Sequence, residues 1–208
     1  MPGVTVSAAF GLNGAAIAAL VAEQLELPLL DRAINSEVAS ALHVSVEEAA
    51  LGSPRKSFTA KFFEILSPLS SGVLGEAAGA TLLDFDEAAT FRAQSEAVIR
   101  ESAATGAVIL GRGGSCALRH EPDVLRVRLF GPEEARVKQA MTVLGIDEAT
   151  ARRQMHEVDS AREHYTKKLY KTDANDPDLF QLQLDSTALS PEVCADVIVR
   201  TYRALVSP

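Results

Sequence analysis

The stretch Val4-Thr5-Val6-Ser7-Ala8-Ala9-Phe10-Gly11-Leu12-Asn13-Gly14-Ala15-Ala16-Ile17-Ala18 decides the fold that the sequence predicts. Its β-branched residues favour a short strand, its glycines favour a turn, and its alanines favour a helix. The first turn of a helix has unpaired N–H groups and the positive end of the helix dipole. A strand, a glycine turn and a helix in this order therefore predict a cradle for a phosphate group.

The side chains that complete a P-loop are missing from this turn. The motif needs a Lys and a Ser or Thr near its second glycine, and Ala15 and Ala16 occupy that region. The sequence thus predicts the backbone of an anion-binding turn without the lysine that makes such a turn catalytic. Whether the protein is a kinase or a kinase-shaped binder depends on that absence.

The composition narrows the class of protein. The chain has 208 residues, of which 47% are hydrophobic, so it can bury one sizeable core with a small inserted lobe. A net charge of −8 argues against a nucleic-acid or anionic-membrane binder. Cys116 and Cys194 form neither a metal-ligand pattern nor a disulfide framework, which favours a reducing compartment. The apolar stretch 15–22 is too short to cross a bilayer, so we expect a cytoplasmic protein.

Strands and helices are expected to alternate along the chain. The pattern predicts strands at 4–8, 27–31, 106–111, 124–130 and 180–184, and helices at 14–25, 32–42, 86–104, 132–144, 147–169 and 191–205, with a further short helix capped by Ser45. This alternation predicts an α/β fold of one domain, residues 1–208, whose parallel sheet is covered by helices on both faces. Ligands of such sheets bind beyond the carboxyl ends of the strands.

Residues 52–85 have a different character. They are rich in Gly, Ser and Pro at both ends and carry a basic aromatic patch, so we interpret them as an inserted, mobile helical lobe. Phe58, Phe62, Ile65 and Leu66 share one helical face. The favoured interpretation of that face is a packing or dimer helix, which leaves a homodimer open.

Arg112 follows a predicted buried strand within Gly111-Arg112-Gly113-Gly114. From there its planar fork could hold a phosphate in two hydrogen bonds, beside the first glycine turn. The alternative is an arginine that pairs with a nearby carboxylate. Because Arg112 follows the carboxyl end of a strand, we favour the interpretation that it binds a phosphate.

The helix around Asp159 carries a second set of candidates. At 100° per residue, Val158, Tyr165 and Leu169 align as a buried stripe, which predicts that Tyr165 is a core residue. Arg162 lies at the margin of that stripe, within ion-pair reach of Asp159. A carboxylate beside arginines can hold them for a phosphate or accept a hydrogen bond from a sugar or base. An ordinary exposed, salt-bridged helix explains the same spacing equally well.

Several ordered motifs resemble the cytidylate kinase-like family, relatives of the P-loop nucleoside monophosphate kinases. They are the opening turn, Pro28-Leu29-Leu30-Asp31-Arg32, Ile109-Leu110-Gly111-Arg112-Gly113, Asp159-x-x-Arg162-x-x-Tyr165, Asp176-Pro177 and Leu184-Asp185-Ser186-Thr187-x-Leu189-Ser190. The resemblance covers nearly the full length and implies a P-loop NTPase-like fold. It also implies a lid-like segment over 147–178, built on a pair of helices.

The family implies transfer of a phosphoryl group from ATP, with Mg²⁺, to CMP or dCMP. Carried over to this chain, the resemblance implies that Arg112 and Arg162 hold the acceptor phosphate or the transferring group. It places Asp159 near the acceptor base or sugar, Asp31 in the substrate site and Arg136 beside the donor base. The donor phosphates would be wrapped by Gly11, Leu12, Asn13, Gly14, Ala15 and Ala16. No protein ligand for a metal is expected, and the partner would be a small-molecule nucleotide.

The chain differs from the family at positions where family members carry charged side chains near the phosphates. Members often carry an arginine where this chain has Ala8 and another where it has Ala15, and true cytidylate kinases carry an aspartate where it has Gly113. One arginine acting on phosphoryl charge can be worth about 10³ in rate. The alternative function is therefore a catalytically inactive relative, a pseudokinase that binds a nucleotide or phosphate for regulation. A kinase for another small hydroxyl-bearing acceptor is a third, weaker interpretation.

Overall fold

The computed structural model describes residues 3–30 and 85–207. Asp31, the helices expected at 32–42 and after Ser45, and nearly all of the predicted 52–85 insert lie outside the described residues. None of the helices in the described ranges is both long enough and apolar enough to span a bilayer.

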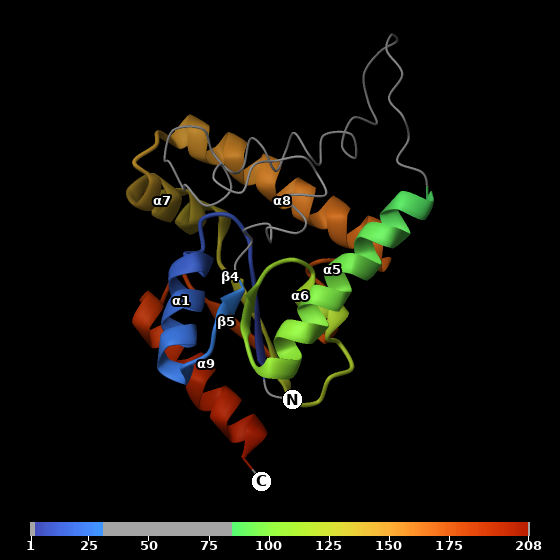
Figure 1. Cartoon of the computed structure of the whole chain (residues 1–208). Helices are drawn as coiled ribbons and strands as arrows, with labels where there is room; N and C mark the ends of the chain where they lie inside the picture. The colour runs from blue at the N-terminus through green and yellow to red at the C-terminus, as the bar shows by residue number, and fades with distance from the viewer. Residues whose placement is uncertain (1–2, 31–84, 208) are drawn as a thin grey trace, which may run out of the picture.

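The described residues form a five-stranded sheet in the order β2-β3-β1-β4-β5 (Figure 1). Every neighbouring pair is parallel, and Val4 of β1 lies opposite both Val108 and Leu125. The α/β fold with a parallel sheet is therefore confirmed. The strands are β1 Gly3–Ala8, β2 Leu29–Leu30, β3 Val108–Leu110, β4 Val124–Phe130 and β5 Leu182–Asp185.

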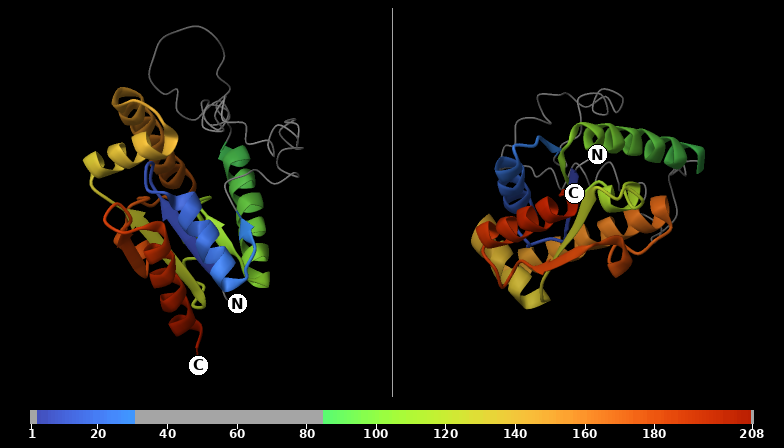
Figure 2. Two further views of the ribbon diagram at one scale, coloured as in Figure 1. Left: turned by 90° about the vertical axis from the view of Figure 1, so that its left-hand side faces the viewer. Right: turned by 90° about the horizontal axis from the view of Figure 1, so that it is seen from below.

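Helices cover both faces of this sheet. One face packs against α1 (Gly14–Leu25) and α9 (Pro191–Val206), and the other packs against α5 (Phe85–Thr105) and the short α6 (Gly114–Ala117). The helix pair α7 (Glu133–Leu144) and α8 (Glu148–Tyr170) lies across the end of the sheet where β1 finishes (Figures 1 and 2). This is the edge at which a ligand of a parallel sheet binds.

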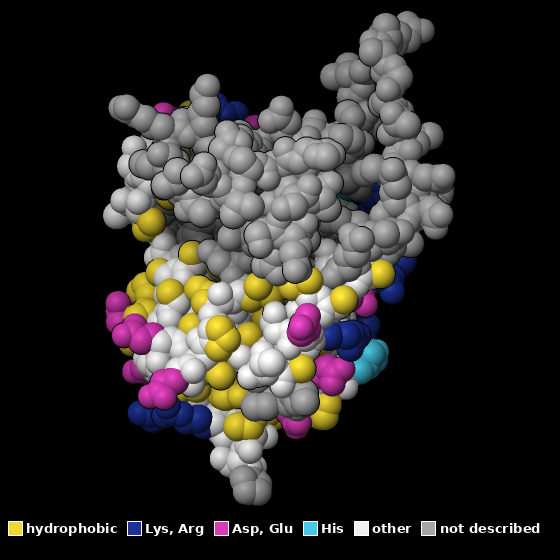
Figure 3. Space-filling model, viewed as in Figure 1, with side chains coloured by type: hydrophobic (Ala, Val, Ile, Leu, Met, Phe, Trp, Pro, Cys, Tyr) yellow, Lys and Arg dark blue, Asp and Glu magenta, His cyan; other side chains and the backbone are white. Residues whose placement is uncertain are grey.

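The two-residue period of β1 divides the core between these layers. Val4 and Val6 are buried against α1 and α9, whereas Thr5 is buried on the side of α6. A side chain on Gly114 would stand 3.3 Å from Thr5 and Ile109, so the start of α6 lies close against the sheet. On the face seen in Figure 3, hydrophobic side chains gather over α1, where the exposed positions include Ala15, Ala16 and Ala19.

Most predicted elements are present, and the differences are local. Pro132 caps α7 from outside the helix, and β5 begins at Leu182 instead of 180. The connection between α8 and β5 contains a 3₁₀ helix, Pro177–Leu179, capped by the Asp176 side chain, which the pattern did not predict. Helix α6 was not predicted, and three residues with positive φ, Gly111, Arg112 and Gly113, separate it from β3. Tyr165 is only half-buried rather than a core residue.

Candidate functional site

The glycine turn joins β1 to α1 through Phe10–Asn13. Gly11 has a φ of +78° and Asn13 a φ of +52°, so the chain bends sharply before the helix. No side chain in the described ranges caps the start of α1, and Ala15 and Ala16 are exposed there. The first turn of α1 thus keeps the anion-binding character of a helix N-terminus.

Both glycines of the turn are required by contacts inside the protein. A side chain on Gly11 would place its Cβ 2.5 Å from the carbonyl oxygen of Arg136 on α7. A side chain on Gly14 would stand 2.5 Å from the Cβ of Ala8, which is itself buried.

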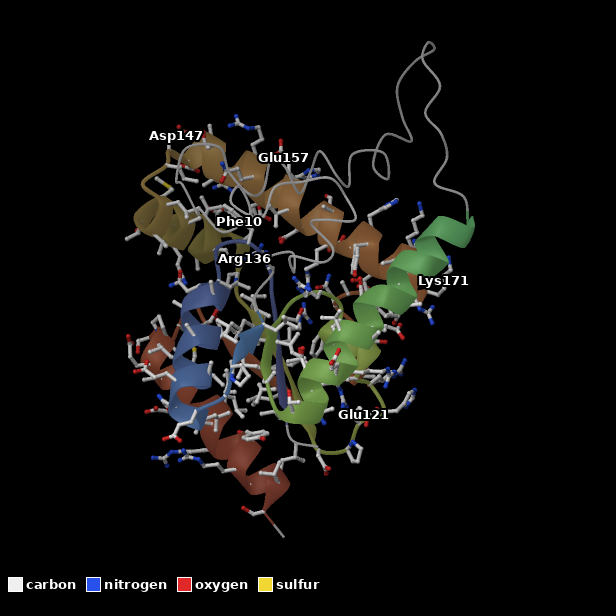
Figure 4. The ribbon with its side chains drawn as sticks, viewed as in Figure 1. Phe10, Glu121, Arg136, Asp147, Glu157 and Lys171 are labelled. Carbon is white, nitrogen blue, oxygen red and sulfur yellow. The ribbon has the colours of Figure 1, made fainter. Side chains whose placement is uncertain are left out.

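Helices α7 and α8 hold the main chain of Phe10. The Phe10 N–H donates to Asp159 Oδ1 (3.0 Å), and Arg136 Nε donates to the Phe10 carbonyl oxygen (2.9 Å). Arg136 Nη2 also donates to Asp159 Oδ2, and both side chains of this ion pair are mostly buried. We call Phe10, Arg136 and Asp159 the Phe10 clasp; Figure 4 shows Phe10 and Arg136 beneath α7 and α8.

A second link holds the turn from the side of β5. The buried Ser186 hydroxyl donates to the Leu12 carbonyl oxygen (3.0 Å), and the Leu12 side chain is buried in the core. Asp185 shapes this loop by accepting hydrogen bonds from the Thr187 N–H and hydroxyl. The glycine turn is therefore tied to α7, α8 and the end of β5.

Two arginines meet Asn175 next to the clasp. Arg162 Nη2 donates to Asn175 Oδ1 (2.6 Å), and Arg162 Nη1 donates to the Ser7 hydroxyl at the end of β1 (3.3 Å). Arg128, on β4, donates to the same Asn175 Oδ1 (3.2 Å) and to the Asn175 carbonyl oxygen (3.0 Å). We call Arg128, Arg162 and Asn175 the arginine cluster.

The side chains of the clasp, Arg136 and Asp159, and those of the arginine cluster line one cavity of about 140 Å³ at the carboxyl edge of the sheet. Three arginines face two carboxylates across it, which leaves an excess of one positive charge. Burial lowers the pKa of Arg162, and the nearby Arg128 and Arg136 lower it further, whereas Asp159 and Glu163 act in the opposite direction. A small anion would balance this charge. The lining residues are Ala9, Leu12, Arg128, Leu129, Phe130, Gly131, Arg136, Asp159, Arg162, Glu163 and Asn175.

Arg112 lies apart from this cavity. It follows β3 with a φ of +57° and is not among the lining residues. Burial raises the pKa of Tyr165 to about 12, and the charge of Arg112 opposes that rise, which places the guanidinium near α8. The structure therefore brings Arg162, Asp159 and the glycine turn together at one cavity, and Arg112 does not line that cavity.

Tyr170 fills the space beside Gly113. A side chain on Gly113 would stand 2.6 Å from the Tyr170 ring, and the φ of Gly113 is +69°. The pKa of Tyr170 is raised, mainly by burial, so its hydroxyl stays protonated. Position 113 is thus shaped for glycine by the last residue of α8.

Arg152 forms no ion pair with Asp159 among the described residues, although both lie on the same side of α8. It forms ion pairs with Glu133, Glu134 and Glu148 in an exposed network that links α7 to α8. Asp159 forms its ion pair with Arg136 instead. In the described ranges, no three His, Cys, Asp or Glu side chains lie together as a metal site would need.

A model of the cytidylate kinase-like family matches residues 3–188. The chain belongs to this family. No curated protein matches the chain. The family and the parallel sheet together establish a nucleotide kinase-like fold.

Three solved structures resemble the chain over nearly its whole length. An uncharacterized protein from Eubacterium ventriosum is 18% identical with a TM-score of 0.65, and the match covers 98% of each chain. Shikimate kinase from Acinetobacter baumannii is 12% identical with a TM-score of 0.52 and covers 100% of this chain and 96% of its own. A sugar kinase from Janibacter is 19% identical with a TM-score of 0.51 and covers 99% and 96%. At these identities the likeness shows the fold alone.

The sequence motifs do not mark Arg128, Asn175 or Glu163 as site residues. The signal for Arg128 was present, because Arg126 and Arg128 alternate with buried residues on β4 and Arg128 stands near the carboxyl end of the strand. No local pattern marks Asn175, whose side chain meets Arg128 across 47 residues of sequence.

Proposed function

We propose that this member of the cytidylate kinase-like family is a nucleotide phosphotransferase, with ATP as donor and CMP or dCMP as acceptor. The observation that carries the proposal is the cavity beside the glycine turn, which collects Arg128, Arg136 and Arg162. Phosphoryl transfer depends mostly on positioning and on neutralising charge. Guanidinium groups suit both tasks, because their planar fork binds two phosphate oxygens at once.

In this proposal the two substrates approach the edge of the sheet from different sides. The donor phosphates lie against the first turn of α1, where helix N–H groups face an anion and Ala15 and Ala16 leave the approach open. The acceptor phosphate enters the cavity and meets Arg162. Asp159 acts through Arg136 and Phe10, because both of its carboxylate oxygens already accept hydrogen bonds from them.

Mg²⁺ fits this site only as a companion of the donor phosphates. The described residues offer no cluster of metal ligands, and the nearby carboxylates of Asp159 and Glu163 are engaged with Arg136, Phe10 and Asn175. When bound with ATP, the ion would neutralise charge on the phosphates. The protein's own contribution is to hold the phosphates and exclude water.

A second function, nucleotide binding without transfer, is favoured by one feature. Ala15 and Ala16 stand where a P-loop has its lysine and hydroxyl, so the donor side has helix N–H groups without a cationic side chain from α1. Binding needs less charge than transfer, because transfer must also stabilise the charge that develops in the transition state. A protein that only binds a nucleotide would need the cavity but not the P-loop lysine.

One panel separates the two functions. ATP, CMP, dCMP and inorganic phosphate are tested with and without Mg²⁺ by thermal shift, and formation of CDP or dCDP is measured, on the parent protein and on Arg162→Ala. The exposed Arg153→Ala on the same helix serves as the control. Product that depends on Arg162 supports the phosphotransferase. Stabilisation by nucleotides without product supports the binder, and no response to any nucleotide or to phosphate removes both.

A further inference from the structure

Asn175 stands in the arginine cluster in the place that an anion would take. Its Oδ1 accepts from Nη2 of both Arg162 (2.6 Å) and Arg128 (3.2 Å). Its Nδ2 donates to Glu163 Oε1 (3.0 Å). One neutral amide oxygen therefore bridges two guanidinium groups that come from α8 and β4.

The charge balance of the cluster favours an anionic oxygen over this amide. Hydrogen bonds from a guanidinium to an ionised oxygen are roughly twice as strong as those to a neutral one. Burial already lowers the pKa of Arg162, and Arg128 lowers it further, so the guanidinium lacks full compensation. In addition, Arg162 Nε is buried and has no hydrogen-bond partner among the described residues.

Asn175 is well placed to leave. It lies in the short connection between α8 and the 3₁₀ helix Pro177–Leu179, where Asp173 Oδ1 accepts from its backbone N–H (2.8 Å). That bond and the contact of Arg128 with its carbonyl oxygen hold the main chain in place. Rotation of the side chain alone would vacate the position between the arginines.

We propose that Arg128 and Arg162 form a two-arginine site for a phosphate monoester, and that Asn175 is its built-in competitor, displaced when the phosphate binds. This inference rests on the proposed function and deepens it, because it assigns Arg128 and Asn175 to the acceptor phosphate. A phosphate oxygen replaces the amide oxygen and receives charge-assisted hydrogen bonds from both forks. A ligand without a doubly charged phosphate gains too little to displace the amide, so the cluster selects against free nucleosides.

Titration calorimetry with inorganic phosphate, CMP and cytidine tests the proposal on the whole chain. We expect phosphate and CMP to bind and cytidine to fail. Asn175→Ala removes the competitor and should tighten phosphate binding several-fold, whereas Arg128→Gln should weaken it about tenfold or more. Arg200→Gln, an exposed change on α9, is the control and should match the parent.

Asn175→Asp provides the sharpest variant. It places a permanent carboxylate between the two arginines, so phosphate should bind at least about tenfold more weakly while the protein stays folded. Glu163→Gln in the same chain supplies an amide that can donate to the new carboxylate, which removes the repulsion between two acids. The weaker binding should persist in this double variant.

The results separate this inference from the proposed function. If Asn175→Ala weakens phosphate binding, or if Asn175→Asp binds phosphate as the parent does, Asn175 is not a competitor and the inference is wrong. Phosphate binding that follows the expected pattern, with CMP no tighter than phosphate, would keep the inference and remove CMP as the acceptor. A parent protein that binds neither phosphate nor CMP contradicts the inference outright.

Discussion

The first turn of α1 and the arginine cavity lie at the same edge of the sheet but offer an anion different groups. The first turn offers backbone N–H groups, and the cavity offers guanidinium groups. The start of α1 presents two alanines and uncapped helix N–H groups. The cavity collects three arginines from β4, α7 and α8. In a kinase with a complete P-loop, α1 would supply a lysine as well. Here the side-chain cations are concentrated on the cavity side, so the cavity offers guanidinium groups and the start of α1 offers only backbone N–H groups.

The largest expected effect is on the rate of phosphoryl transfer, when a cationic side chain is added to the first turn of α1. Ala15→Lys restores a cation at an exposed position in the first turn of α1. Because one added group that stabilises developing charge is worth about a hundredfold in rate, formation of CDP from ATP and CMP should rise by about that factor. Ala19→Lys, one turn further along the same exposed face, should leave the rate unchanged. Equal rates in the two folded variants would contradict the comparison.

The next effect tests the clasp that joins the two sides. Asp159→Ala leaves the mostly buried Arg136 without its carboxylate and the Phe10 N–H without its acceptor. The free energy of unfolding should fall by about 2 to 3 kcal/mol, measured by urea denaturation. Arg152→Ala breaks an ion-pair network of similar size that is exposed, and should change stability little. Equal losses would show that the clasp adds nothing beyond a surface pair.

A smaller effect on stability distinguishes two reasons for glycine at position 11: its positive φ and its close contact with α7. Gly11→Ala and Gly145→Ala both force a side chain into a positive φ, which costs about 1 kcal/mol. Only the alanine at position 11 meets another group, the Arg136 carbonyl oxygen, because nothing lies within 4 Å of a side chain at position 145. Gly11→Ala should therefore lose about 1 to 2 kcal/mol more than Gly145→Ala. Similar losses would mean that α7 moves aside without difficulty.

The smallest effect concerns the loop that supports the turn from β5. The pKa of Asp185 lies below its ordinary value, first because the Thr187 hydroxyl donates to it and then because the Thr187 N–H does. A lowered pKa stabilises the fold above the unfolded value near 4 and loses this effect as the pH falls through the folded value. Thr187→Val should raise the pKa of Asp185 toward normal in an NMR titration. Its effect on stability should be slight at pH 7 and should diminish as the pH falls below 4.

The sequence predicted the elements of the fold well because their signals are local. Helix α1 spans the expected Gly14–Leu25, and β4 spans the expected Val124–Phe130. Hydrophobic period, caps and turn residues act over a few positions, so they can be recognised without the tertiary structure. The cavity edge was also foreseeable, because the carboxyl ends of parallel strands meet there.

The partners of the site residues could not be predicted in the same way. Asp159 was expected within reach of Arg162, yet its ion pair is with Arg136, because the packing of α7 against α8 decides which arginine arrives. The glycine pattern predicts a phosphate cradle at Gly11 but carries no sign that the Arg136 carbonyl oxygen stands against this residue. Both contacts join residues on different elements, α7 with α8 in the first case and α7 with the turn after β1 in the second, and the spacing within one helix carries no information about them.

The contact between Gly113 and Tyr170 couples the two positions. An aspartate at 113 would stand against a ring whose centroid lies 6.3 Å from that of Tyr165 and which has the Arg92 guanidinium over it. The ring must shift, or a smaller side chain must replace it, before a carboxylate fits at 113. The charge that position 113 can carry therefore depends on the size of the residue at position 170.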